Sequence, residues 1–318
     1  MDRKSFLAML LGVAASLASA DDFPTRRLTL VVPFAAGTAT DNIARLLAAD
    51  IGRDAKVPVI VENRPGADGN LAAMSVLRAD PDGYTVFITT NSTHAANINL
   101  FKSLPFDPKA DFTPVTGIAK IPMMLAVKTD FPAKNIADYF ALAKKTDKPL
   151  TFGTGSQTGR GAGELMKERE RLALTHVPYK ASTQAMTDLI GGHVDSIFTD
   201  PVSATGLVQK GLVRVLAVTS AKRAPTMPDV PTLDESGLPG FELIAWIAAF
   251  AHEKTPRETV AKLNALITAS LNNPATAAYL LKAGATAFPT TPEQLGAFAD
   301  SDTKRWARIV EAAKMEKQ

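Results

Sequence analysis

The chain has 318 residues, of which 46% are hydrophobic, and it carries a formal net charge of +3. This length is sufficient for two domains of ordinary size, each with a core of its own. The absence of Cys excludes disulfides, thiolate metal sites, Cys nucleophiles and lipidation of a Cys at a cleavage site. Basic residues are interleaved with acidic ones, as in 167–171, so there is no basic stripe that would favour nucleic acid as a partner.

The first 20 residues have the features of a secretory signal peptide. Arg3 and Lys4 precede an apolar stretch from Phe6 to Leu17, and Ala18-Ser19-Ala20 supplies the small residues of a cleavage site. A membrane anchor is the alternative, but this stretch is shorter than the roughly 20 residues needed to span a bilayer. We expect export to the periplasm, with cleavage near Ala20.

The first part of the mature chain alternates β-branched runs with helical patterns. Ile43, Leu47 and Ile51 recur at helical spacing after a turn-forming segment. The predicted elements are strand Leu28–Val32, a helix capped by Thr40 or Asp41, strand Val57–Glu62, a helix ending near Ala79, and strand Tyr84–Thr89, followed by the polar loop Thr90–Thr93. A break is expected near Pro105–Pro114.

A second series of strands and helices follows. Its predicted elements are strand Met123–Val127, helix Ile136–Lys145, strand Leu150–Phe152, helix Ala162–Leu172, strand Thr175–Tyr179, helix Thr183–Gly191, and strands Ser196–Phe198 and Val213–Thr219. Residues 224–239 are rich in Pro and Gly and predict a loop. The chain is expected to end with strand Phe241–His252 and helices Pro256–Leu271, Pro274–Ala283 and Pro292–Lys314.

This alternation predicts the α/β class, with parallel sheets covered by helices on both faces. We expect residues 21–123 and 245–318 to form lobe one and residues 124–244 to form lobe two, joined by two crossing strands with a cleft between them. Open α/β sheets bind ligands at the carboxyl ends of their strands. Two loops at such ends, 37–41 and 154–159, present backbone N–H groups that favour an anion. Each alone is equally an ordinary strand-to-helix turn, but the pair in matching positions favours binding.

No motif predicts catalysis, a cofactor or a metal. The glycines of 153–159 lack the G-x-G-x-x-G spacing of a dinucleotide site, and the four His residues are dispersed. Ser156 lacks the final Gly of a nucleophile elbow, because Thr158 occupies that position. Ser92, His94 and Asp200 form an imaginable triad, but Ser92 and His94 are neighbours on one loop.

Several segments resemble one family, the Bug receptors, which are the extracytoplasmic solute receptors of tripartite tricarboxylate transporters. The resemblance covers essentially the whole mature chain. The matching segments are Val32-Pro33-Phe34, Asp41-Asn42-Ile43-Ala44-Arg45, Val61-Glu62-Asn63-Arg64-Pro65-Gly66-Ala67, Asp82-Gly83-Tyr84-Thr85, His176-Val177-Pro178-Tyr179-Lys180, Leu216-Ala217-Val218-Thr219, Pro231-Thr232, Glu235-Ser236-Gly237, Pro239-Gly240 and Trp246.

The resemblance implies a type II periplasmic binding fold whose two lobes close on a small organic acid. It also implies that main-chain amides, hydroxyls and ordered waters hold the ligand. Carried onto this sequence, it implicates Phe34, Gly37, Thr38, Ala39, Thr40, Asp41 and Ser92 in lobe one, and Thr154, Ser156, Thr158, Tyr179 and Asp200 in lobe two. Two alternatives stay open: Tyr179 as a core residue with its hydroxyl bonded locally, and Asp200 as a helix cap or turn residue.

The sequence departs from the family pattern at the inferred pocket. Ala36-Gly37-Thr38 replaces a Pro-Gly-Gly turn, the loop before Ala162 is shorter, Arg160 stands where His is common, and Ala181 replaces a Gly. Arg160 either offers a fork for a second carboxylate or faces solvent at a helix start.

The leading hypothesis is a monomeric transport receptor that delivers a carboxylate to a membrane permease. The alternatives are an input protein for a sensor kinase and a secreted hydrolase. A hinge motion about the two crossings would close the cleft on the ligand.

Overall fold

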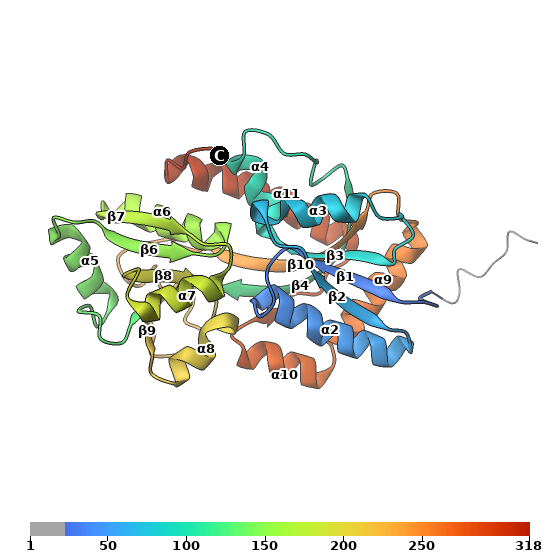
Figure 1. Cartoon of the computed structure of the whole chain (residues 1–318), viewed down its shortest axis with the longest axis horizontal. Helices are drawn as coiled ribbons and strands as arrows, with labels where there is room; N and C mark the ends of the chain where they lie inside the picture. Colours follow the sequence, from blue (N-terminus) through green and yellow to red (C-terminus); the bar gives the residue numbers. More distant parts are fainter. Residues whose placement is uncertain (1–22) are drawn as a thin grey trace, which may run out of the picture.

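The computed structural model describes residues 23–318 and contains two β-sheets flanked by helices, which lie side by side along the long axis of the molecule (Figure 1). The six-stranded sheet has the order β11-β4-β10-β3-β1-β2, and the five-stranded sheet has the order β7-β6-β8-β5-β9. We call these sheets, with the helices packed on them, lobe one and lobe two. The predicted α/β class with two lobes is confirmed. The predicted signal peptide lies outside the described residues.

Lobe one is built from both ends of the described chain. Its elements are β1 (Leu28–Val32), α2 (Ala39–Ala55), β2 (Val59–Asn63), the 3₁₀ turn η3 (Ala67–Gly69), α3 (Asn70–Leu77), β3 (Thr85–Thr90), the π-helical segment η4 (Ser92–Ala96), α4 (Asn97–Leu100), β4 (Phe112–Pro122), β10 (Ile244–His252), α9 (Arg257–Leu271), α10 (Pro274–Lys282), β11 (Thr286–Ala287) and α11 (Pro292–Ala312).

Lobe two is one continuous stretch. Its elements are β5 (Met124–Lys128), α5 (Ile136–Lys145), β6 (Leu150–Thr154), α6 (Gln157–Glu170), β7 (Leu174–Pro178), α7 (Ser182–Gly191), β8 (Ser196–Thr199), α8 (Pro201–Gln209) and β9 (Val213–Val218).

Strand β1 is buried on both of its faces, although it is next to the edge strand β2. Leu30 and Val32 belong to the same apolar cluster as Ile43 of α2, whereas Val31 belongs to a second cluster with Phe87 of β3. Helices on both faces of a sheet require such a continuous apolar run rather than an alternating one. The sequence pattern and the observed burial therefore agree for this strand.

Both sheets are mixed, so the expectation of parallel sheets holds for some strand pairs and not for others. Strands β1, β2 and β3 are parallel, but β10 runs antiparallel to both β3 and β4, and β5 runs antiparallel to β8 and β9. Strand β4 was also missed, because Pro114 suggested a break. In the structure Pro114 pairs with Phe250 next to a register shift, a place where a strand tolerates proline. Helix α8 was missed as well.

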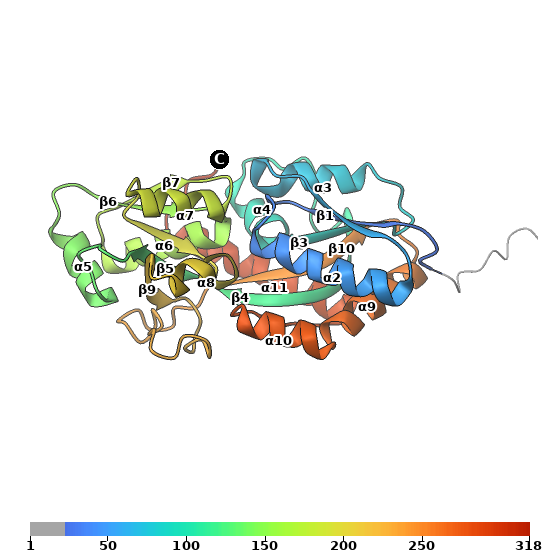
Figure 2. The same cartoon turned by 60° about the horizontal axis from the view of Figure 1, so that its bottom comes forward.

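The two crossings between the lobes are both hydrogen-bonded to Thr219, which follows β9. The chain enters lobe two through Met123, whose backbone N–H donates to the Thr219 hydroxyl oxygen at 2.8 Å. It returns through Leu243, whose carbonyl accepts from the same hydroxyl at 2.6 Å. Thr219 is fully buried. The view in Figure 2 shows β4 and β10 side by side where they approach lobe two.

The lobes also touch beside the cleft, where α11 of lobe one meets α6 of lobe two. Gly161 lies against the ring of Trp306, so closely that a Cβ at position 161 would be 2.8 Å from the ring. On β10, Trp246 donates from Nε1 to Oδ2 of buried Asp302 on α11 at 2.8 Å, a bond within lobe one.

Within residues 23–318, no helix is both long and apolar enough to cross a membrane.

Candidate ligand-binding cleft

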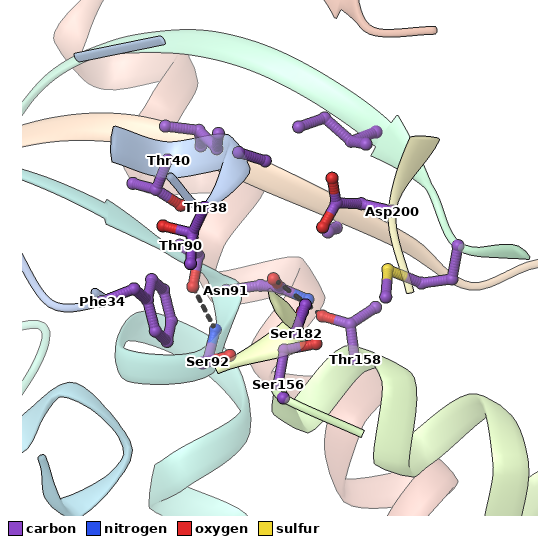
Figure 3. Close-up of a pocket in the computed structure, with 16 residues that line it drawn as sticks. Phe34, Thr38, Thr40, Thr90, Asn91, Ser92, Ser156, Thr158, Ser182 and Asp200 are labelled. Atoms are coloured by element: carbon purple, nitrogen blue, oxygen red, sulfur yellow. Dashed lines mark hydrogen bonds between the residues drawn. The ribbon is translucent and has the colours of Figure 1, made fainter. Parts of the chain in front are cut away.

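A cavity lies between the two lobes, at the carboxyl ends of strands of both sheets (Figure 3). It is narrow, with a volume of about 50 Å³. Its lining residues are Phe34, Thr38, Ala39, Thr40, Thr90, Asn91, Ser92, Ile121, Met123, Gly155, Ser156, Thr158, Ser182, Asp200, Ala245 and Ile247.

Four helices begin at this cavity. Helix α2 has Thr38 as its N-cap, rather than the predicted Thr40 or Asp41, and α6 has Ser156. Helix α7 starts with Ser182, and α8 has Asp200 as its N-cap. The first N–H groups of a helix lack partners within the helix and carry a partial positive charge. Their convergence makes the cavity suitable for an anion without a basic side chain.

Asp41 fixes the loop before α2 and does not line the cavity. Its carboxylate accepts from the N–H of Gly37 at 2.8 Å, from Nε of Arg45 at 3.0 Å and from Nδ2 of Asn63 at 2.9 Å. Burial alone would raise the pKa of Asp41, but these hydrogen bonds outweigh it and lower the pKa. Gly37, with a φ of +82°, also lies outside the lining, so both residues shape the loop that presents Thr38.

Asn91 and Ser92 contribute polar groups from the end of β3. The predicted polar loop here is the start of η4 instead. The Asn91 amide oxygen accepts from the Thr158 hydroxyl at 3.1 Å, which joins the two lobes across the cavity. Nδ2 of Asn91 and Oγ of Ser92 are buried without a hydrogen-bond partner among the described residues. Buried polar groups of this kind are normally satisfied, so both are available to water or a ligand.

Lobe two places Ser156 and Thr158 at the cavity but not Thr154 or Tyr179. Thr154 bonds to Nε2 of His176 at 2.7 Å. The Tyr179 hydroxyl donates to Asp188 at 2.8 Å, in keeping with the alternative of a locally bonded tyrosine. Burial and then the Asp188 carboxylate raise the pKa of Tyr179 to about 12. The structure therefore brings eight of the twelve predicted residues to the lining and leaves out Gly37, Asp41, Thr154 and Tyr179.

Asp200 has two roles that the sequence presented as alternatives. It lines the cavity, and it also caps α8 by accepting from the N–H of Ser203 at 2.7 Å and from the Ser203 hydroxyl at 3.0 Å. Burial raises the pKa of Asp200, and the bonds from Ser203 oppose that rise.

Sequence reasoning missed eight lining residues. Four are polar or small and lie at strand-to-helix junctions, the positions that identified the others: Thr90, Asn91, Gly155 and Ser182. The junction before α7 carried the same signal as the other loops but was not singled out. The other four form an apolar floor on and beside β4 and β10: Ile121, Met123, Ala245 and Ile247. Nothing in an apolar strand distinguishes a cavity floor from ordinary core.

The structure also locates Arg160 and the residues of the imagined triad. Arg160 lies one turn into α6 and does not line the cavity, so the structure gives it no position as a fork for a carboxylate there. The imagined triad is not assembled either. His94 is absent from the lining; its Nδ1 lies 2.9 Å from the Thr93 hydroxyl, and its ring stacks on Phe250. Burial lowers the pKa of His94 to about 3, which keeps the ring neutral.

Two α/β lobes around an anion-favouring cavity define the class of two-lobed solute-binding proteins, and solved structures of that class superimpose closely on this one. The R. palustris protein Rpa4515 with adipate has a TM-score of 0.90 and 34% identity, covering 93% of this chain and all of the other. The periplasmic binding protein BugD has a TM-score of 0.88 and 34% sequence identity, and the match covers 93% of this chain and all of the other. MatC from Rhodopseudomonas palustris with bound malate has a TM-score of 0.85 and 33% sequence identity, and the match covers 91% of this chain and all of the other.

Residues 43–315 match TctC, the tripartite tricarboxylate transporter family receptor. The chain therefore belongs to the TctC family, and its resemblance to the Bug receptors is confirmed.

Proposed function

We propose that this protein is a periplasmic receptor that captures a small carboxylate in its cleft and delivers it to the membrane subunits of a tripartite tricarboxylate transporter. The observation that carries the proposal is the cavity itself. The N-termini of α2, α6 and α7 and the unpartnered groups of Asn91 and Ser92 converge there, beside the N-terminus of α8, which Asp200 caps. Such a site can hold a carboxylate by hydrogen bonds alone. Adipate and malate in the structural neighbours support the same ligand class.

The proposal includes the processing and motion of the chain. Residues 1–20 would be removed near Ala20, and the mature protein would act as a monomer without a catalytic centre. Residues 21–123 and 245–318 would move as lobe one and residues 124–244 as lobe two. The crossings joined by Thr219 would serve as the hinge. The bond from Thr158 to Asn91 supports a closed arrangement here, because an open cleft would separate these side chains.

A binding experiment tests this function. The chain from Asp21 onwards is unfolded and refolded to remove any carried-over ligand, and is then titrated with a panel of organic acids by calorimetry and thermal shift. A ligand that binds only the native state adds about 2.7 kcal/mol of stability at a concentration of 100 times Kd. A dose-dependent rise in Tm with a carboxylate supports the proposal, and no response in a refolded chain contradicts it.

The site is tested with Ser92→Ala. We expect affinity for the bound acid to fall about tenfold or more, because a hydrogen bond to a charged group contributes about 1.5–3 kcal/mol. Ser75→Ala on α3 is the matched control, since the Ser75 hydroxyl donates to the carbonyl of Ala72 and does not line the cavity. Equal affinities of the two variants would refute the assignment. Recovery of the acid chemically changed would favour a hydrolase, and retention by a sensor-kinase ectodomain rather than a permease would reassign the partner.

A further inference from the structure

The cavity has one ionisable side chain among its described lining residues, and that side chain is an acid. Neither Lys, Arg nor His lines it, whereas Asp200 does. A cavity that favours an anion through helix N-termini therefore holds a carboxyl group of its own. This combination has a consequence for the ligand, because two carboxylates in a poorly hydrated space repel each other.

The polar groups on the lobe-one side favour an acceptor. The Asn91 amide oxygen is already bonded to the Thr158 hydroxyl, so the group left over is the amide donor, Nδ2. The Ser92 hydroxyl beside it is also unpartnered. Both residues are at least 98% buried. A carboxylate oxygen satisfies two such groups, whereas leaving them bare costs free energy.

The Asp200 side of the cavity has the opposite preference. In the view of Figure 3, Asp200 and Ser92 lie on opposite sides of Asn91. One Asp200 oxygen accepts from the Ser203 N–H and the other from the Ser203 hydroxyl, which leaves acceptor capacity on each. An ionised carboxylate has no hydrogen to donate. It is therefore complementary to a hydroxyl or ammonium group.

The cavity also has an apolar floor, formed by Ile121, Met123, Ala245 and Ile247. These side chains offer no hydrogen-bond partner, so they favour contact with the methylene groups of a ligand. The arrangement thus fits a short chain of methylene groups with a carboxylate at one end.

We propose that Asp200 is a specificity-determining residue that selects acids carrying a hydroxyl or ammonium group at the end away from the carboxylate, and disfavours plain dicarboxylates of equal length. This inference rests on the proposed function and deepens it. Such a ligand also compensates the burial of Asp200, whose pKa burial raises, because a donor stabilises the charged carboxylate.

Four acids of equal chain length test the inference: 4-hydroxybutyrate, 4-aminobutyrate, succinate and butyrate. The refolded mature chain is titrated with each by calorimetry. We expect 4-hydroxybutyrate or 4-aminobutyrate to bind about tenfold or more tightly than succinate, because a site built for a donor discriminates against groups that cannot supply one. Butyrate, which lacks both features at its far end, should also bind more weakly than the donor acids.

The decisive variant is Asp200→Asn. Asn is as good an N-cap as Asp, so α8 stays capped while the negative charge disappears. We expect the preference for the donor acids over succinate to shrink about tenfold. Asp188→Asn is the matched control, because this lobe-two carboxylate bonds to Tyr179 and does not line the cavity; its preference should equal that of the wild type.

The outcomes distinguish failure of the role of Asp200 from failure of the proposed receptor function. If succinate binds the wild type as tightly as the donor acids, and Asp200→Asn changes nothing, the role of Asp200 is refuted while the carboxylate receptor stands. If neither this set nor the wider panel of acids binds, the proposed function fails and the inference falls with it.

Discussion

Gly155 offers a direct test of how closely the cavity wall is built. It lies at the end of β6 and lines the cavity, and its neighbours are the backbone atoms of Ala181 and Ser182 at the start of α7. A Cβ at position 155 would lie 2.7 Å from Cα of Ser182 and closer still to the Ser182 nitrogen. Carbon atoms in ordinary contact are about 3.5–4.0 Å apart, so Gly155→Ala must displace α7 by roughly 1 Å.

The expected cost follows from that displacement. Overpacking a well-packed interior typically costs about 1–3 kcal/mol, and here the obstacle is backbone that no rotamer change can move aside. At about 2–4 °C per kcal/mol for domains of 150–250 residues, Tm should fall by roughly 2–12 °C. Because Ser182 lines the cavity, the same shift should weaken ligand binding about tenfold.

Thermal and urea denaturation measure the first effect, and calorimetry with the identified acid measures the second. Gly206→Ala is the matched control, since Gly206 is in α8 and a Cβ there meets no atom within 4 Å. It should stabilise the protein by about 0.5–1 kcal/mol, as alanine does in a helix interior. If Gly155→Ala were as stable as the wild type and bound the acid equally well, the steric reasoning would be wrong.

Two further predictions concern buried carboxylates away from the cleft. Asp50 accepts from the hydroxyls of Thr276 at 2.6 Å and Ser270 at 3.0 Å and pairs with Arg53; burial would raise the pKa of Asp50, but these partners outweigh it and lower the pKa. Asp50→Ala should cost about 1–3 kcal/mol at pH 7. The pKa of Asp50 in the folded protein lies below the ordinary 3.8, so its contribution to stability is present above about pH 4 and is lost as the pH falls through the folded pKa. Urea denaturation should therefore give a smaller difference in stability between the variant and the wild type at pH 3 than at pH 7. An equal difference at both pH values would contradict the assignment. Trp246→Phe removes the buried donor to Asp302 and should cost about 1–3 kcal/mol, measured by denaturation followed through the remaining Trp306; an unchanged midpoint would mean that the bond contributes nothing.

The sequence predicted the fold best where local pattern and tertiary burial coincide. Strand β1 and helix α2 carry uninterrupted apolar signals, and both are found. Strand β4 was hidden because Pro114 looks like a break until its partner Phe250, far away in the chain, is known to lie at a register shift. Strand direction was also not predictable from local pattern, since whether β10 runs parallel or antiparallel to β3 depends on the path by which the chain re-enters lobe one from lobe two.

The candidate site was predictable at loop level more than at side-chain level. The junctions before α2 and α6 were located, but Asp41 and Tyr179 turned out to bond to Asn63 and Asp188 rather than to face the cavity. A sequence states which polar groups are near a strand end, not which ones are already satisfied by neighbours. The apolar floor was invisible for a related reason, because Ile121 and Ile247 read as core in any strand.

Lobe two is inserted between two strands that are already neighbours. Pro122, at the end of β4, and Ile244, at the start of β10, are partners in the same antiparallel ladder. Facing Cα atoms in such a ladder are only about 4.5–5.5 Å apart, a gap that a two-residue hairpin turn closes. Lobe two is thus an insertion whose first and last residues lie next to each other, at the ends of two paired strands of the lobe-one sheet. Replacing it with the corresponding segment of a relative would exchange the cavity wall that holds Ser156 and Asp200 and leave the wall that holds Thr38 and Ser92 in place. The two walls of the cavity can therefore be exchanged independently of each other.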